Sequence, residues 1–429
     1  MSLLSAAPRY RTNEEEFARI RTVVAGGVSS NMRARGVTVP LVVREAYGCR
    51  LHDVEDNELV DLNMGYGAHL FGYADTEVTG DIADQFGRGH LTGLPHEHDA
   101  EAAGLIAELV PSVQQVRFAN SGTEAIASAV RLARAATARN LVVVFTDHYH
   151  GWSETLLRAR GTPAGLPLLP GAPGMIPGAL DHTLQVAWND RAAVDAVFAA
   201  HPERIAAVIL EPVRVSARVS EPVPGFLEHL RETTRRHGSL LIFDEVVSGF
   251  RVARGGAQER YGVEPDLTVV SKVLGGGFPV AAFGGGRELM AAFERDEAFH
   301  AGVYAGNHAA TRAVISMLGK IKRSPGTYHR LEAIGAYAEQ RVNEAFAIAG
   351  TPVLTARVGS VLSVVTLRRT GSDLVADPDL HRDLQARCQG SGFYFHPNPL
   401  EPWFLSTAHD ESDLDACADV ITRSLRSLG

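Results

Sequence analysis

The chain has 429 residues, 45% of them hydrophobic and 21% charged, which is the composition of a folded globular protein rather than a disordered one. Its 41 basic and 50 acidic side chains give a formal net charge of −9 and form no basic stripe, which argues against a nucleic-acid-binding protein. The N-terminus lacks a secretory signal pattern, and no run approaches the roughly 20 apolar residues that span a bilayer, so we expect a cytoplasmic protein without a membrane partner.

The predicted elements begin with two strand-like segments, Leu41–Arg44 and Arg50–Asp53. Further along, apolar runs predict strands at Gln115–Phe118, Leu141–Phe145, Ala206–Leu210, Leu240–Phe243, Leu267–Val270 and Val280–Phe283. Between them, apolar periodicity predicts helices at Glu124–Ala138, Arg191–Ala200 and Gly225–His237. This alternation is typical of an α/β domain with a mostly parallel central sheet flanked by helices, whose ligands bind beyond the carboxyl ends of the strands.

A chain of this length exceeds one ordinary core, so two domains are expected. From about Ala309 the pattern changes to a long helical stretch through Phe346, followed by strand-like segments within Val353–Leu367 and a last helix at Asp413–Leu425. We predict a large domain at 61–308 and a smaller C-terminal domain at 309–429. Residues 1–60 are expected to pack against the smaller domain.

The segment Gly161–Gly178 contains ten glycines and prolines in eighteen positions, which argues against a regular helix or strand. A long loop in a folded domain is either a functional lid or a surface insertion. We predict a lid that closes over the substrate, with a surface insertion as the alternative.

Lys272 and Asp244 stand at the ends of two predicted strands. Lys272 follows an apolar run and precedes the flexible triplet Gly275–Gly277, and Asp244 ends another apolar run. Pyridoxal 5′-phosphate (PLP) enzymes need such a pair, because the amine forms a Schiff base with the aldehyde and the carboxylate keeps the pyridine nitrogen protonated. The alternatives are a surface lysine at a turn and an aspartate paired with an arginine such as Arg251. We predict that both residues are catalytic.

The segment Asn120–Ala125 directly follows a predicted strand. Ser121 and Glu124 form an S-x-x-E capping box, and the simplest interpretation is a well-capped helix. The free N–H groups at that helix start, the small Gly122 and the hydroxyls of Ser121 and Thr123 also suit a phosphate group. Together with the lysine and the aspartate, they favour a phosphate-binding site.

Tyr149 follows a predicted strand, where its ring can stack on one face of the cofactor. Val246, two residues beyond Asp244, would cover the other face. His148 and His150 suggest a metal site, but no carboxylate or cysteine stands at the usual ligand spacing nearby, so we predict no metal. The three cysteines are irregularly spaced and predict neither a zinc cluster nor a disulfide framework.

Further motifs extend the pattern nearly from end to end. They are Gly26–Ala34, Asn120–Ala125, Tyr149–Gly151, Pro224–Phe226, Leu241–Val252, Gly255–Ala257, Tyr261–Leu267, Ser271–Lys272 and Gly275–Gly277. With them the chain resembles the class III PLP-dependent aminotransferases, and most closely the glutamate-1-semialdehyde 2,1-aminomutase group. The resemblance implies the PLP-dependent transferase fold of type I, with a large domain and a smaller α+β domain. It also implies a homodimer with active sites at the subunit interface.

The resemblance assigns roles to individual positions. The cofactor-binding set that it implies is Ser121, Gly122, Thr123, Tyr149, Asp244, Val246, Lys272 and Val303, the last in the segment Gly302–Asn307 that would reach the neighbouring subunit's phosphate. The substrate-binding set is Arg33, Tyr66, Ser216 and Glu401. Within it, Arg33 would pair with a substrate carboxylate and Glu401 would lie close to the substrate amino group. Lys272 would also move protons at the substrate carbon.

The chain departs from the family pattern mainly where the family binds substrate. Val303 replaces a threonine, so a hydroxyl for the phosphate is missing, and Tyr66 replaces a tryptophan. The segment Val215–Arg218 replaces a Gly-Asn-Met-Gly stretch, which removes an amide and both glycines. Arg214 and Arg218 suggest a second anion site there. These changes indicate the shared chemistry applied to a different substrate.

We therefore expect a PLP-dependent aminotransferase that moves an amino group between a small carboxylate-bearing amino acid or amino ketone and a keto acceptor through a Lys272 Schiff base. The alternative is a glutamate-1-semialdehyde 2,1-aminomutase, in which one molecule is both donor and acceptor. Gly161–Gly178 and Arg33 favour the mutase, and Val215–Arg218 weighs against it. A cofactor-binding protein without catalysis is a third hypothesis, which the intact lysine, aspartate and tyrosine disfavour.

Overall fold

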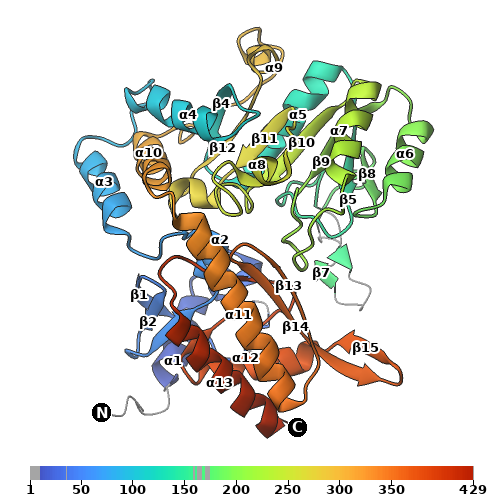
Figure 1. The fold of residues 1–429 in the computed structure, drawn as a ribbon. Helices are drawn as coiled ribbons and strands as arrows, with labels where there is room; N and C mark the ends of the chain where they lie inside the picture. The colour runs from blue at the N-terminus through green and yellow to red at the C-terminus, as the bar shows by residue number, and fades with distance from the viewer. Residues whose placement is uncertain (1–9, 35, 158–159, 162–166, 170–173, 429) are drawn as a thin grey trace. The chain divides into compact units, whose positions relative to one another are not determined.

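The computed structural model describes residues 10–34, 36–157, 160–161, 167–169 and 174–428 and divides them into two units (Figure 1). The larger unit is Thr76–Tyr328, and the smaller one combines the described residues up to Asp75 with those from His329 onward. The smaller unit is therefore built from both ends of the chain.

A seven-stranded sheet runs through the larger unit in the order β4-β12-β11-β10-β9-β5-β8. Its strands are β4 (Gln115–Ala119), β5 (Leu141–Phe145), β8 (Thr183–Val186), β9 (Ile205–Leu210), β10 (Leu240–Glu245), β11 (Leu267–Val270) and β12 (Ala281–Gly285). All pairs from β8 to β11 are parallel, and β12 runs antiparallel to both β11 and β4. The predicted α/β fold with a mostly parallel sheet is confirmed. Of the seven strands of this sheet, the sequence analysis missed the short strand β8.

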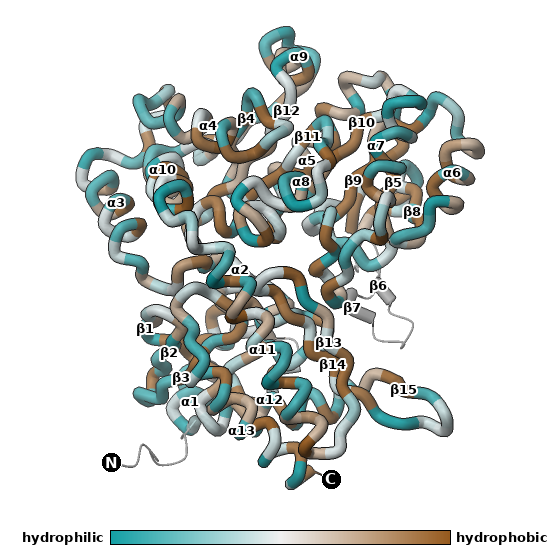
Figure 2. Tube along the Cα trace, in the orientation of Figure 1, coloured by the Kyte–Doolittle hydropathy of each residue, from teal (hydrophilic) through white to brown (hydrophobic). Residues whose placement is uncertain are grey.

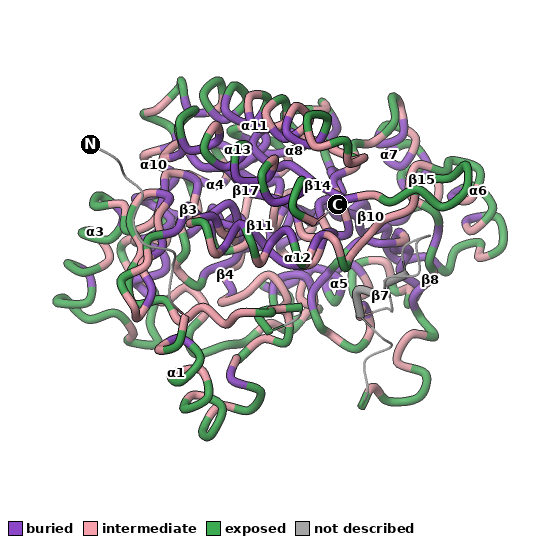
Figure 3. The backbone as a smooth tube through the Cα atoms, turned by 90° about the horizontal axis from the view of Figure 1, so that it is seen from below, coloured by how far each residue is buried: buried purple, intermediate pink, exposed green. Residues whose placement is uncertain are grey.

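Helices cover both faces of this sheet. Helix α5 (Gly122–Thr137) packs on one face, over alternate strand residues such as Val142 and Val144, and helices α6 (Arg191–Ala200) and α7 (Phe226–His237) pack on the other face. Burial on both sides explains why the inner strands, such as β5 and β9, are continuous apolar runs. These inner strands are mostly brown in Figure 2 and purple in Figure 3.

The larger unit also contains several helices outside the sheet layers, and the last of them, α10 (His308–Arg323), determines where the unit ends. They are α3 (Thr76–Gly87), α4 (His98–Leu109), α8 (Gly256–Tyr261), the short turn η3 (Lys272–Gly275), α9 (Arg287–Met290), η4 (Ala291–Phe293) and α10. The expected boundaries at 60/61 and 308/309 lie elsewhere in the structure, at 75/76 and 328/329. The second boundary moves because α10 packs against α3 and α4 and so belongs to the larger unit.

The smaller unit contains two further sheets and one core. Strands β1 (Val43–Tyr47), β2 (Arg50–Asp53), β3 (Glu58–Asp61) and β16 (Phe393–Tyr394) form one sheet, and β13 (Val353–Val358), β14 (Val361–Thr370), β15 (Asp373–Ala376) and β17 (Trp403–Phe404) form the other. The helical elements are α1 (Arg11–Arg21), η1 (Ala25–Gly27), η2 (Asn31–Arg33), α2 (Met64–Gly67), α11 (Thr327–Ala349), α12 (Pro378–Gln389) and α13 (Glu411–Leu428). Val60 and Leu62 share a core with Phe346 and Ile421, so the N-terminal strands pack with the C-terminal helices.

The long helical stretch expected from Ala309 through Phe346 is wrong in one respect, because it forms two helices. Helix α10 ends at Arg323 and α11 begins at Thr327, with Pro325 between them. Proline lacks a backbone N–H and restricts the residue before it, so the helix cannot continue through this position.

The glycine- and proline-rich segment also differs from the expectation. Two short strands, β6 (Arg160–Gly161) and β7 (Pro167–Leu169), pair antiparallel. Proline is tolerated here because it is the first residue of its strand. Of the predicted lid Gly161–Gly178, residues 162–166 and 170–173 lie outside the described residues. Among those that are described, no helix is long and apolar enough to cross a membrane.

Gly335 on α11 leaves no room for a side chain, since an added Cβ would lie 2.1 Å from the carbonyl oxygen of Gly359. We expect Gly335→Ala to lower the free energy of unfolding by about 1–3 kcal/mol, the usual cost of overpacking, as a reduced urea midpoint. Gly104→Ala on α4 is the control, because its Cβ meets nothing within 4 Å. This control should raise stability by about 0.5–1 kcal/mol. Equal effects of the two substitutions would contradict the close contact.

Candidate active site

Lys272 lies directly beyond the carboxyl end of β11, at the start of η3. Its neighbour Ser271 donates a hydrogen bond from Oγ to the carbonyl oxygen of Val280 at 2.8 Å. Lys272 itself has φ +48°, a left-handed value that residues other than glycine adopt rarely. Strain of this kind persists where the surrounding structure holds the residue in place, and it is concentrated at functional sites.

Asp244 lies on β10, which is the parallel neighbour of β11, so the two residues share one edge of the sheet. Its carboxylate is buried, and Oδ2 lies 2.7 Å from Nδ1 of His150 while Oδ1 accepts the N–H of Val246 at 3.1 Å. Burial raises the pKa of the Asp244 carboxyl, and the His150 hydrogen bond lowers it. The partner that the structure gives Asp244 is therefore His150, in place of the arginine considered in the sequence analysis.

A second buried carboxylate organises the loop that carries Tyr149. Oε1 of Glu211 accepts the backbone N–H of Tyr149 at 2.7 Å, and Oε2 accepts those of Val215 and Ser216 at 2.9 and 3.1 Å. The Glu211 N–H in turn donates to Nδ1 of His148 at 3.0 Å. One carboxylate thus holds together the segment of Tyr149 and the segment of Ser216.

The start of helix α5 packs tightly against the Tyr149 loop and against the residues that follow Asp244. Ser121 is the N-cap and accepts the N–H of Glu124 at 3.3 Å. A Cβ on Gly122 would lie 3.0 Å from a methyl of Val246, and a Cβ on Gly151 would lie 2.6 Å from Oγ1 of Thr123. The two glycines therefore let the helix start, the Tyr149 loop and the end of β10 meet.

These features fit PLP. The first turn of the 16-residue helix α5 offers free N–H groups and two hydroxyls to a phosphate, and Asp244 offers a buried, hydrogen-bonded carboxylate to a ring nitrogen. Tyr149, 38% exposed, and the half-buried Val246 stand beside these groups. Val303 differs from the other predicted residues, because its side chain is 72% exposed and lies in the loop before α10.

Three predicted substrate residues, Arg33, Tyr66 and Glu401, lie in the smaller unit. The pKa of Tyr66 is raised to about 12, mainly by burial; the charge of Glu401 contributes to the rise and that of Arg33 opposes it. Both charges therefore act on the same hydroxyl. Tyr66 has φ +55°, and its N–H donates to Oδ1 of Asn63 at 2.8 Å. Ser216 lies in the larger unit with the cofactor-binding set.

His150, Glu211 and Gly151 are site residues that the sequence reasoning missed or misread. His150 was considered only as a metal ligand, although its position next to Tyr149 could have suggested a site role. Glu211 could not be recognised from the sequence, because its role is to join Val215, four residues downstream, to Tyr149, 62 residues upstream. Among the described residues, no group of three or more histidine, cysteine, aspartate or glutamate side chains could hold a metal ion.

The sheet order, the lysine beyond β11 and the carboxylate on β10 define a PLP-dependent enzyme of fold type I. Residues 32–367 match the family model for class III aminotransferases, and the chain therefore belongs to that family. It is 41% identical over 416 residues to a glutamate-1-semialdehyde 2,1-aminomutase of Thermomicrobium roseum. The aligned region covers 94% of this chain and 96% of that protein.

Solved structures agree with this assignment. An omega-transaminase from Sphaerobacter thermophilus is similar with a TM-score of 0.88 and 31% identity, over 96% of this chain and 97% of that one. A transaminase with PLP bound is similar with a TM-score of 0.90 and 26% identity, over 98% of this chain and 99% of that one. The expected fold class, family and cofactor are confirmed, and the cofactor is PLP.

His150→Phe removes the hydrogen bond to Asp244 and leaves the carboxylate buried. Since His150 lowers the pKa of Asp244, its loss should raise that pKa, so the protonated carboxyl persists to higher pH. We expect the acid limb of the kcat/KM profile to move to higher pH, and kcat/KM near neutrality to fall about 10- to 100-fold, as for a buried charged hydrogen bond.

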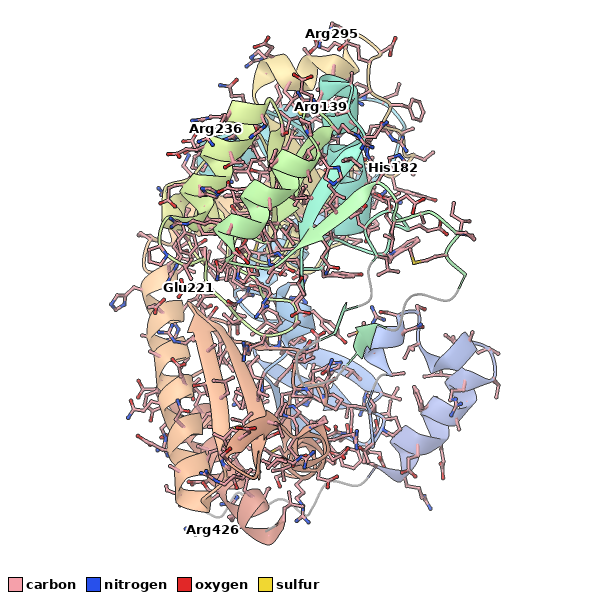
Figure 4. All side chains as sticks on the ribbon, turned by 90° about the vertical axis from the view of Figure 1, so that its right-hand side faces the viewer. Arg139, His182, Glu221, Arg236, Arg295 and Arg426 are labelled. Atoms are coloured by element: carbon pink, nitrogen blue, oxygen red, sulfur yellow. The ribbon has the colours of Figure 1, made fainter. Side chains whose placement is uncertain are left out.

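His182→Gln is the control for this substitution, because His182 is an exposed histidine on the loop before β8 (Figure 4). Both pH limbs should be unchanged in it. A wild-type acid limb in His150→Phe would show that His150 has no influence on Asp244.

Proposed function

We propose that this chain transfers an amino group on a small amino acid or amino ketone that carries a carboxylate. The observation that carries the proposal is the placement of Lys272 and Asp244 at one edge of neighbouring parallel strands, beside the start of helix α5. When bound, PLP supplies an electron sink for the electron pair left at the substrate carbon after a proton is removed.

The chain's own residues divide the remaining work. The Lys272 amine moves the proton at the substrate carbon, and the strained backbone of that residue fixes where the amine starts. Asp244, held by His150, keeps a proton on the ring nitrogen through an ion pair that the buried surroundings strengthen. The first turn of α5, with Ser121 and Thr123, holds the phosphate, and Tyr149 and Val246 flank the ring.

The first candidate reaction is that of a glutamate-1-semialdehyde 2,1-aminomutase, which makes 5-aminolevulinate. The high identity to the aminomutase of Thermomicrobium roseum over nearly the whole length of both chains supports it. Arg33 would pair with the substrate carboxylate. Glu401, whose charge helps to raise the pKa of the neutral Tyr66 hydroxyl, would lie close to the substrate amino group.

An intermolecular aminotransferase is the second candidate. Its support is the segment Val215–Arg218, which departs from the aminomutase pattern and whose first two backbone N–H groups donate to Glu211. The similarity to an omega-transaminase at 31% identity supports it as well.

Supplying glutamate-1-semialdehyde as the only substrate separates the two candidates. An aminomutase should form 5-aminolevulinate without an added amino donor or acceptor, measured by mass spectrometry. Lys272→Ala should bind PLP without a covalent link and lower turnover by about 100- to 10,000-fold, the usual contribution of a general acid–base group. If the wild type leaves glutamate-1-semialdehyde unchanged on its own but converts its aldehyde to an amine when an amino donor is added, the second candidate replaces the first.

We also propose a homodimer, as the family resemblance implies. Large apolar side chains are exposed on one short stretch before α10, with Phe299 70%, Val303 72% and Tyr304 62% exposed. Contiguous exposed apolar residues of this kind are typical of a protein–protein interface.

Light scattering after gel filtration should give twice the monomer mass for the wild type and a larger monomer fraction for Val303→Glu. Leu374→Glu changes an exposed leucine on β15 and is the control, which should remain dimeric. A wild-type monomer at micromolar concentration would contradict the proposal.

A further inference from the structure

The chain after Glu211 forms a small loop closed by a single β-bridge. The N–H of Arg214 donates to the carbonyl oxygen of Ser220 at 3.1 Å, and the N–H of Ser220 donates back to Arg214 at 2.9 Å. The bridge encloses five residues, which we call the Val215–Val219 loop. The bridge fixes both ends of this loop and so restricts the conformation of its main chain.

The Val215–Val219 loop is attached to the backbone of Tyr149. Glu211 accepts two N–H groups of the loop with Oε2 and the N–H of Tyr149 with Oε1. Because all these groups share one buried carboxylate, the loop lies next to the residue that we propose to stack on the ring. A side chain of this loop can therefore take part in substrate binding.

Arg214 is already engaged in holding the loop. Its side chain is 10% exposed, Nε donates to the carbonyl oxygen of Arg218 at 3.2 Å, and Nη1 lies 3.6 Å from Oδ2 of Asp147. Burial lowers the pKa of Arg214, Asp147 raises it, and the nearby charge of Arg218 lowers it. The two guanidinium groups thus repel each other across the loop, and Arg214 has a structural role.

Arg218 is in a different situation. It is half-buried, and among the described residues its guanidinium forms no ion pair with a carboxylate within 4.0 Å. Its φ is +92° and that of Ala217 is +63°, although both residues have a Cβ. The backbone here is held in a conformation typical of glycine, while the side chain adds a positive charge beside Arg214. An anion bound to Arg218 would relieve this repulsion.

We propose that Arg218 binds the second carboxylate of a dicarboxylic amino donor or keto acceptor. The inference rests on the proposed amino transfer. A planar guanidinium accepts a carboxylate through two parallel hydrogen bonds, so a substrate with a second carboxylate is preferred over its neutral isostere. The pair that tests this is L-glutamate and L-glutamine, which have nearly the same shape and differ in charge.

The experiment measures the first half-reaction of the PLP-loaded enzyme through the absorbance of bound PLP, at increasing concentrations of L-glutamate or L-glutamine. The wild type should reach half its maximal rate at a lower concentration of glutamate than of glutamine. In Arg218→Gln the concentration required for glutamate should rise about 10- to 100-fold, the value of a charge-assisted hydrogen bond, while that for glutamine stays the same.

Two further variants keep the test informative if Arg218→Gln folds poorly. Arg218→Gly suits φ +92° and should fold at least as well as the wild type, yet lose the same preference. Arg236→Gln removes one positive charge from the exposed surface of α7 and is the matched control, which should keep the wild-type preference (Figure 4).

The outcomes test the role of Arg218 separately from the proposed amino transfer. Equal response of the wild type to glutamate and glutamine, or an unchanged preference in Arg218→Gly, overturns the role of Arg218 while leaving amino transfer intact. A wild type that reacts neither with these donors nor with glutamate-1-semialdehyde overturns the proposed function itself, and with it this inference.

Discussion

The candidate cofactor site is organised around one buried carboxylate, that of Asp244. Burial disfavours the charged form of Asp244, and the hydrogen bonds from His150 and from the Val246 N–H oppose that effect. Both partners also shape the cofactor site, since His150 follows Tyr149 and Val246 packs against Gly122. The contacts that support the acid therefore also position the groups around the ring and the phosphate.

The parts of this site that could be predicted are those with local signals. An apolar run that ends on one polar residue predicts both a buried strand and a side chain at its end, which placed Asp244 and Lys272 correctly at the ends of β10 and β11. The S-x-x-E pattern likewise predicted the start of α5, where Ser121 caps the helix. Parallel pairing then brings these chain segments to one edge.

The parts that could not be predicted depend on contacts between distant segments. Glu211 looks like any acid at a strand end, and only the folded chain shows that it joins Tyr149 to Ser216. The unit boundary is of the same kind, because the assignment of α10 depends on its packing against α3 and α4. The break at Pro325, in contrast, had a local signal that the helical periodicity on both sides obscured.

The bridge between Arg214 and Ser220 has a consequence for how such enzymes diversify. Because the main-chain N–H of Ser216 donates to Glu211, the side chain of this half-buried position can change while that hydrogen bond is kept. Substitutions in this loop can therefore change which substrates the enzyme accepts, while the residues that hold the cofactor stay the same.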